Sequence, residues 1–403
     1  METKVSNFVN QPGLKITLLL TGSLTVMAGA VITAAIPNIK NSFGSMENAE
    51  LLSKLVVTLP SLFIALVAPF AGRLIDHAGR KKVLLWALFF YAAGGTSGLY
   101  LSDVYLLLLG RAVLGISVAG IMTINTTLIG DYFRGKMRSR FMGWQGAFMG
   151  FGGVFFVSAG GLLADISWRW PFAVYGVSWI LLLMAYKYLY EPQIVKRNVA
   201  KRLPGKSQLK NKKYLLLYLT AFFGMLFFYL IPTQVPFLLQ HGGVMKNSTI
   251  GFSISIAVLM GALVSVNYGK IRQRLNFYQI YVLTFLLMGA GYVMTSLFSG
   301  YAGILAGLIV AGFGTGMLMP NTNLWLISLA PAEKRGRMVG LLNLAVYSGQ
   351  FLSPVVVAPL NVRWSIGFTF LICGVLMVVM AMWFYGLHRQ SRRQAMGKIS
   401  QGD

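Results

Sequence analysis

The 403-residue chain has little cysteine, little acid and little charge of any kind. Its single cysteine, Cys373, excludes a small secreted domain held together by disulfides. Charged residues make up 11% of the chain, against about 25% in an average soluble protein. Hydrophobic residues make up 56%. Water is therefore not the solvent for most of this surface, and soluble enzymes and disordered proteins are excluded as well.

Long apolar stretches account for this composition. There are twelve, and one helical crossing of a bilayer takes roughly 20 apolar residues. They cover residues 16–37, 55–71, 83–102, 104–128, 141–163, 170–186, 214–238, 248–268, 276–299, 301–329, 338–360 and 364–387. None alternates like a strand, and a helix pairs its backbone groups internally in hydrocarbon. The sequence predicts an all-α integral membrane protein with twelve transmembrane helices.

The net charge of +25 would suit a nucleic-acid partner if the Lys and Arg residues formed one stripe on a folded surface. They do not. With the N-terminus placed in the cytoplasm, 29 of the 35 Lys and Arg residues fall on cytoplasmic segments. The external segments hold Lys40, Lys54, Arg169, Lys246 and Arg363, and Arg111 remains inside a span. This bias is the positive-inside pattern. We expect a multi-pass protein of the cell membrane with both termini cytoplasmic and no nucleic-acid partner.

A basic segment at residues 191–213 divides six spans from six. We expect a six-helix bundle over residues 1–190, a cytoplasmic linker over 191–213 and a second six-helix bundle over 214–403. The linker could bind anionic lipid headgroups, or it could be solvated chain that enforces topology. A shift of 197 residues superposes the halves, because it aligns Gly72 with Gly269, Gly94 with Gly291, Gly110 with Gly307, Gly115 with Gly312 and Arg138 with Arg335. Such repeats are typical of transporters.

The loop between the second and third spans carries a specific motif. It reads Gly72-Arg73-Leu74-Ile75-Asp76-His77-Ala78-Gly79-Arg80-Lys81. The glycines permit a tight turn, and Asp76 offers an acceptor beside the charge of Arg80 and Lys81. The string resembles the hallmark loop of the major facilitator superfamily at every signature position. The second half has Gln273 where the first has Asp76.

Two further strings resemble the twelve-helix drug and proton antiporters of that superfamily. Residues 111–119 are similar to their fourth-helix motif, although Leu114 replaces the usual glutamine. Residues 168–172, Trp-Arg-Trp-Pro-Phe, also resemble that branch. The fifth-helix motif departs from it, because Phe156-Val157 stands where the branch has a Gly-Pro pair. The resemblance implies two bundles around one central site that opens alternately to either side.

No acidic residue falls in the middle of a span, and the three histidines lie in loops or at helix ends. A midplane carboxylate that couples transport to protons is therefore not supported. The candidates for coupling are Asp76, Asp131, Glu47 and Glu50, each of which also has a structural explanation as an ion-paired or solvated charge. The loop motif implies a cytoplasmic gate made of Gly72, Asp76, Gly79, Arg80, Lys81 and Asp131, which holds that face closed in the outward-open state.

Arg111 is the one charge assigned to the interior of a span, where such residues are costly and commonly functional. It either lies beside the substrate path or braces the fourth helix by binding carbonyl oxygens. Other polar or aromatic residues of the central helices are candidates for lining the path, with interhelical hydrogen bonding as the alternative for each. They are Asn125, Tyr229, Gln234, Asn321, Asn323, Trp325, Asn343, Tyr347 and Gln350.

These features together predict a secondary active transporter that exports small amphiphilic molecules, driven by protons. Arg111 without a carboxylate favours neutral, zwitterionic or anionic substrates. A facilitator or importer of a sugar or organic acid is the alternative, and a non-transporting receptor is disfavoured because the connecting segments are short. No nucleotide-binding loop, cofactor motif or enzymatic constellation is present, since the glycine-rich strings lie inside apolar spans. We expect a monomer whose partners are its substrate, protons and lipids.

Overall fold

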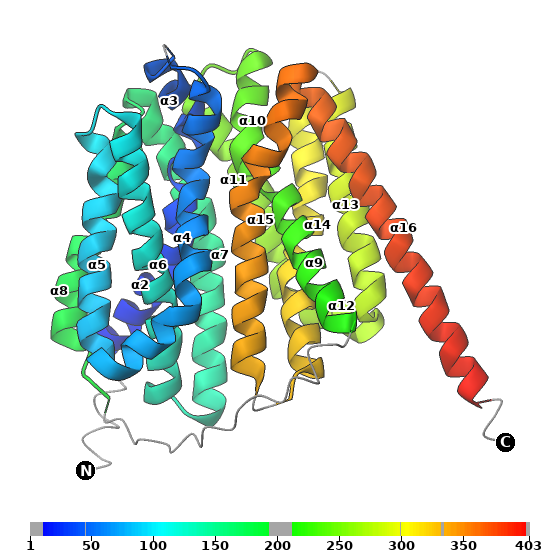
Figure 1. Cartoon of the computed structure of the whole chain (residues 1–403), viewed down its shortest axis with the longest axis horizontal. Helices are drawn as coiled ribbons and strands as arrows, with labels where there is room; N and C mark the ends of the chain where they lie inside the picture. Colours follow the sequence, from blue (N-terminus) through cyan, green and yellow to red (C-terminus); the bar gives the residue numbers. More distant parts are fainter. Residues whose placement is uncertain (1–10, 45, 193–211, 299, 332–333, 400–403) are drawn as a thin grey trace.

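A computed structural model describes residues 11–44, 46–192, 212–298, 300–331 and 334–399, without the side chains of 72–74, 76–78 and 394–399. Within this part the chain is helical and contains no strand (Figure 1). The helices of the first half are α2 (Pro12–Ala30), η1 (Thr33–Ala35), α3 (Ile36–Ser42), α4 (Ala49–Ala78), α5 (Arg80–Thr96), η2 (Ser97–Leu99), α6 (Val104–Tyr132), α7 (Gly135–Ile166), η3 (Trp170–Gly176) and α8 (Val177–Tyr188).

The second half repeats this order. Its helices are α9 (Lys212–Phe228), α10 (Leu230–His241), α11 (Asn247–Val266), α12 (Tyr268–Arg274), α13 (Phe277–Leu297), α14 (Tyr301–Leu329), α15 (Arg335–Arg363) and α16 (Ile366–Ile399). Eleven continuous helical segments of the described chain are long and apolar enough to cross a membrane. The short helices η3 and α8 together form the twelfth crossing, beside α5 (Figure 1). The predicted all-α membrane fold is confirmed.

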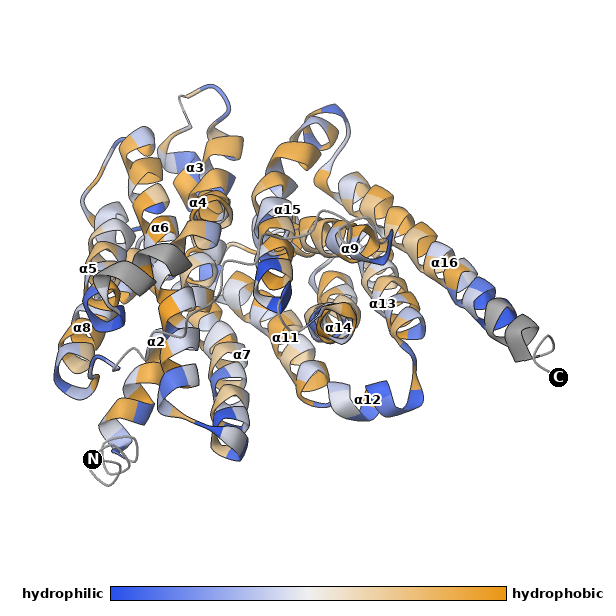
Figure 2. Cartoon of the chain, turned by 60° about the horizontal axis from the view of Figure 1, so that its bottom comes forward, coloured by the Kyte–Doolittle hydropathy of each residue, from blue (hydrophilic) through white to orange (hydrophobic). Residues whose placement is uncertain are grey.

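The bundle has two chemically different ends. The basic end, at the bottom of Figure 1, is where α2 begins and α16 ends. Hydrophilic residues gather there on α12 and at the start of α7 (Figure 2). The far end, at the top of Figure 1, carries α3 and the start of α4. Hydrophobic residues predominate in the helices between the two ends (Figure 2), as a hydrocarbon solvent requires.

Close helix contacts follow the internal repeat. A methyl group on Gly115 would lie 2.4 Å from Pro60 O, and one on Gly312 would lie 2.5 Å from Ala257 O. Both pairs are related by the shift of 197 residues. Only glycine lets the helix backbones approach this closely. The repeated glycines therefore mark the same two helix crossings, α4 with α6 and α11 with α14.

The first and seventh crossings are broken at equivalent places. Between α2 and α3 the helix gives way at residues 31–35, and between α9 and α10 it gives way at Tyr229. Pro232 explains the second break, because it has no N–H to donate to the carbonyl of Phe228, where α9 ends. Pro37 does the same to the carbonyl of Thr33. Both breaks lie at the middle of the bundle, where the halves meet.

Candidate functional site

A cavity of about 280 Å³ lies between the two halves, beside both helix breaks. Its walls come from α2, α4 and α7 of the first half and from α9, α10, α11 and α15 of the second. The lining includes Ala28, Gly29 and Thr33 at the first break and Phe228, Tyr229 and Pro232 at the second. A site built at broken helices between repeated halves is the arrangement expected for alternating access.

The polar groups of this central cavity are neutral. Ser61 Oγ donates to Gln350 Oε1 at 2.9 Å, and Tyr347 Oη donates to Met122 Sδ at 3.3 Å. The hydroxyl of Tyr229 faces Gly29, where an added methyl group would lie 3.4 Å from it. Among the described residues, no acidic or basic side chain lines this cavity. Three of the predicted path residues, Tyr229, Tyr347 and Gln350, therefore line the central cavity.

Two apolar grooves on the first half are larger than the central cavity. One, of about 540 Å³, lies between α2, α7 and α8, and the other, of about 390 Å³, lies between α4, α5 and α6. Their rims carry exposed aromatic side chains such as Phe155 and Trp86. Such surfaces suit contact with lipid chains rather than recognition of a polar substrate.

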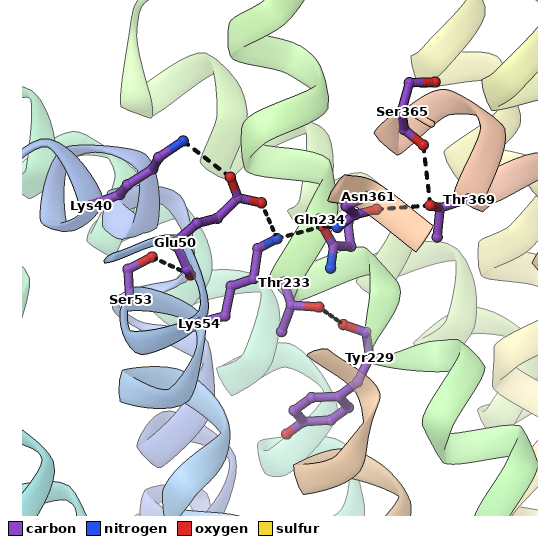
Figure 3. A network of polar contacts seen from close by, with 10 residues as sticks. All are labelled: Lys40, Glu50, Ser53, Lys54, Tyr229, Thr233, Gln234, Asn361, Ser365 and Thr369. Carbon is purple, nitrogen blue, oxygen red and sulfur yellow. Dashed lines mark hydrogen bonds and ion pairs between the residues drawn. The ribbon is translucent and has the colours of Figure 1, made fainter. Parts of the chain in front are cut away.

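A charged cluster, of which Lys54 is the buried member, joins the halves at the far end. Lys54 Nζ lies 2.6 Å from Glu50 Oε1 and donates to Gln234 Oε1 at 2.8 Å (Figure 3). Lys40 Nζ lies 3.0 Å from the other oxygen of Glu50. Asn361 Nδ2 donates to the same oxygen of Gln234 at 2.9 Å. We call Lys40, Glu50, Lys54, Gln234 and Asn361 the far-end cluster.

The position of Lys54 corrects an expectation from the sequence. We predicted that Lys54 belongs to an external loop and that the second span begins at residue 55. Helix α4 instead begins at Ala49, and the side chain of Lys54 is only 3% exposed. The carboxylate of Glu50, one helical turn earlier, offsets the charge that this burial brings into the bundle.

Further bonds between the halves lie from the middle of the bundle to the far end. Asp165 Oδ1 accepts from the backbone N–H of Asn247 at 2.6 Å. Ser158 Oγ donates to Ser255 Oγ at 2.8 Å. With the Lys54–Gln234 bond, these contacts join the two halves on the far-end side of the bundle.

At the basic end, the loop motif forms an ion pair within the first half. Arg80 Nη1 pairs with Asp131 Oδ2. Glu191 accepts from the backbone N–H groups of Arg80 and Lys81, both at 2.7 Å, and so caps the start of α5. Gly79 takes φ 90°, a conformation that favours glycine. Gly72 of the same motif lies within α4, and the side chain of Asp76 lies outside the described part.

Arg111 lies inside the first half and is fully buried. Its Nε donates to Val56 O at 2.8 Å, and its Nη2 donates to Ala28 O. Pro60 has no N–H to offer the carbonyl of Val56, and the break after α2 leaves the carbonyl of Ala28 without its helical partner. Arg111 therefore satisfies two carbonyls that the chain itself leaves free. It does not line the central cavity.

The remaining predicted residues are spread over the bundle. Asn125 lines a smaller cavity of about 240 Å³ between α2, α6 and α7. Asn321 is bonded inside the second half to Tyr268 Oη and Phe277 O. Trp325 stacks on Phe277 with ring centroids 5.3 Å apart. Asn323 and Asn343 are half-buried on α14 and α15, and Glu47 is exposed at the far end.

Several residues of the site were missed from the sequence. Lys54 could have been found from its spacing of four to Glu50, which places the two charges on one helix face. Ser61, Gln145 and Asn361 gave no signal, because single neutral side chains in apolar spans are common. Glu191 was assigned to the linker, and only its position near Arg80 shows its capping role.

Comparisons with known proteins agree with this geometry. A model described as Major Facilitator Superfamily matches residues 18–354 and 245–399. The "Tetracycline resistance protein, class H" of Pasteurella multocida is 28% identical over 268 residues, covering 64% of this chain and 67% of that protein. The "Multidrug transporter protein MdtP" of Bacillus subtilis is 30% identical over 166 residues, but these cover only 40% of this chain and 30% of that protein.

Solved structures share the fold at low identity. A D-xylose–proton symporter superposes with a TM-score of 0.75 at 15% identity, covering 93% of this chain and 97% of that one. A bacterial homologue of the human lysosomal transporter Spinster, in an inward-facing and occupied conformation, has a TM-score of 0.73 at 18% identity, with 93% and 96% covered. At such identities the match concerns the arrangement of helices alone.

Proposed function

Because this chain belongs to the major facilitator superfamily, we propose that it exports small amphiphilic molecules by proton-coupled alternating access. The observation that carries the proposal is the central cavity, which both halves build and which the far-end contacts close on one side. The relatives named for tetracycline resistance and for multidrug transport support an export direction.

We further propose that the basic end faces the cytoplasm of the cell, with both termini there. The positive-inside pattern supports this orientation. In that orientation the structure is closed to the outside, so the far-end cluster is the external gate. Lys54 is its central residue, because its ammonium group binds a carboxylate on its own half and an amide oxygen on the other.

The neutral lining of the cavity supports the proposed substrate class. An ammonium substrate would need a carboxylate or an aromatic cage to offset the loss of hydration. The described lining has no carboxylate, and its aromatic residues Phe228, Tyr229 and Tyr347 lie among hydroxyl, amide and thioether groups. Neutral or zwitterionic amphiphiles therefore fit better than cations. Anions, which the sequence had also favoured through Arg111, lose that argument because Arg111 binds backbone carbonyls away from the cavity.

The coupling residue in this proposal is an acid at one of the two gates. Glu50 binds two ammonium groups in the closed far end, and Asp131 binds Arg80 at the basic end. Either carboxylate would lose its ion pair on protonation, which links proton binding to gate opening. Asp76 remains a candidate through the loop motif.

The test is transport by the purified chain in proteoliposomes with an imposed pH gradient. The panel contains tetracycline and matched neutral, zwitterionic, anionic and cationic amphiphiles, with a sugar and an organic acid as comparison. We expect gradient-driven accumulation of neutral and zwitterionic compounds, abolished when an ionophore collapses the gradient. Accumulation of cations alone would refute the charge argument. Movement that ignores the gradient would refute antiport and favour a facilitator.

A further inference from the structure

Asn125 is a buried amide that the fold leaves without a partner. The residue is 0% exposed, and within the described part neither its Oδ1 nor its Nδ2 has a hydrogen bond. Buried amide groups are normally paired, since an unpaired donor or acceptor has lost its hydration without compensation. An orphaned donor and acceptor on one side chain therefore need an explanation.

The amide of Asn125 lines a cavity of about 240 Å³, which we call the amide pocket. Its walls come from α2, α6 and α7 and include the methionines Met122, Met142 and Met149. Gln145 brings a second amide to the same place. A methyl group on Gly22 would lie 2.9 Å from both Asn125 Nδ2 and Gln145 Nε2. Glycine at position 22 thus leaves the two amides free of a neighbouring side chain.

The amide pocket lies on the way from the central cavity to the basic end. Thr25 and Met149 line both spaces. Met122 of the pocket accepts a hydrogen bond from Tyr347, which lines the central cavity on the other half. The amide pocket therefore adjoins the central cavity on the side toward the basic end.

The second half shows that the fold does not require an unpaired amide at this point. The shift of 197 residues relates Asn125 to Thr322, whose hydroxyl bonds Tyr281 Oη at 2.8 Å and Leu318 O at 2.7 Å. The neighbouring Asn321 has partners for both amide atoms. Polar side chains at this depth are satisfied in one half and left open in the other.

We infer that the amide pocket binds an uncharged polar group of the substrate that both donates and accepts hydrogen bonds, a primary carboxamide. A carboxamide can pair with the orphaned donor and acceptor of Asn125 at once, which a carboxylate, an ammonium or a tertiary amide cannot. The described lining holds no charged side chain to offset an ion. Three methionines provide an adaptable wall for the adjoining apolar body. This inference rests on the proposed function and names its substrate class.

The test uses four probes with one apolar body. They are 4-hexylbenzamide, its N,N-dimethyl amide, 4-hexylbenzoate and 4-hexylbenzylammonium. Their binding to the purified full chain in nanodiscs is measured by equilibrium dialysis, without a gradient. We expect the primary amide to bind about tenfold tighter than the other three, as one well-made hydrogen-bonded pair allows.

Two variants of Asn125 and one matched control separate recognition from folding. Asn125→Leu keeps the branched side-chain skeleton but removes the donor and the acceptor, and we expect it to abolish the tenfold preference for the primary amide. Asn125→Asp keeps the shape but replaces the donor with a carboxylate, and we expect it to favour the ammonium probe instead. Thr322→Val removes a polar group at the equivalent position of the second half, and its preference should equal that of the unaltered chain.

Equal preference in the unaltered chain and in Asn125→Leu would overturn the inference, as would the absence of saturable binding of 4-hexylbenzamide. Failure of the wider proposal looks different. Amide-selective binding without any transport in proteoliposomes would refute export and leave the pocket assigned. Gradient-driven transport without amide preference would refute the pocket and leave export standing.

Discussion

The two halves of the molecule repeat the same close helix contacts at a spacing of 197 residues. A methyl group on Gly94 would lie 2.7 Å from Gly110 O, and one on Gly291 would lie 2.5 Å from Gly307 O. These pairs join α5 to α6 and α13 to α14. The backbone scaffold is therefore the same in both halves, down to the residues that allow helices to touch.

The side chains carried by this scaffold differ between the halves. Arg111 corresponds to the buried Leu308. Arg80 corresponds to Phe277, which stacks on Trp325 instead of forming an ion pair. The unpaired Asn125 corresponds to the fully bonded Thr322. At these three positions the first half keeps a buried charge, an ion pair or an unpaired amide, and the second half has a packed or hydrogen-bonded side chain.

This difference indicates that the two halves have different roles in binding and gating. Buried charges and unpaired amides are costly in hydrocarbon, so they are expected where a ligand or a moving contact uses them. The second half supplies the partners across the interface, such as Gln234 to Lys54 and Tyr347 to Met122. Three substitutions test this comparison, from the largest expected effect to the smallest.

Arg111→Leu gives the first half the residue that the second half has at Leu308. It leaves the carbonyl of Val56 without its donor and Ala28 O with Tyr175 alone. We expect a loss of roughly 2–4 kcal/mol in stability, because buried groups become unpaired. Thermal unfolding in detergent measures it, with transport in proteoliposomes beside it. Leu308→Met, a volume-conserving control, should cost less than about 1.5 kcal/mol. Equal unfolding temperatures for the two variants would contradict the assigned role.

Lys54→Met removes the charged bond between the halves at the far end. A hydrogen bond to a charged group contributes about 1.5–3 kcal/mol, so the far end should open about 10- to 100-fold more often. Spin labels at Ser42→Cys and Met245→Cys, in a Cys373→Ser background, report the distance across that end. We expect a longer distance to gain population.

The matched control for this prediction is Lys40→Met. Lys40 binds the same Glu50 but is 36% exposed and makes no cross-half hydrogen bond among the described contacts. It should shift the distances far less. If both variants opened the far end equally, the bond to Gln234 would not be the gate contact.

Asp76→Asn makes the first loop more like the second, which has Gln273 at this position. The loop motif implies that Asp76 stabilises the state with the basic end closed. Surface ion pairs contribute up to about 1 kcal/mol in general, and a loss of that size would shift the balance up to about fivefold away from that state. The same spin-label pair and a transport assay measure it. No change in either would remove Asp76 from the gate.

Much of the architecture could be predicted because each membrane helix is a contiguous apolar segment of the sequence. Apolar runs of about 20 residues predicted the crossings, and the repeated glycines Gly94 and Gly291 predicted related halves. The predicted start of the second crossing was wrong, because Glu50 and Lys54 interrupt the apolar run. A charged pair within one helical turn can be buried together, which a count of apolar residues does not reveal.

The site was less predictable, because a single polar residue in a span has several possible surroundings. Tyr347 and Gln350 lie at the central cavity, while Gln234 lies in the far-end cluster and Asn321 is bonded within the second half. All four looked alike in the sequence. Which way each points depends on how helices distant along the chain are rotated against one another.

The sequence by itself determined the membrane environment of this protein, its helical crossings, its repeat and its family resemblance. Each of these depends on local composition or on contiguous motifs. Only the tertiary structure decided which polar groups are satisfied. Arg111 donates to two carbonyls, one left free by a proline and one by a helix break. Lys54 donates to Gln234, which lies 180 residues further along the chain, and the amide of Asn125 has no hydrogen-bond partner among the described residues. Pairing between distant segments is a property of the packed bundle, and burial makes that pairing decide the energy of each polar group.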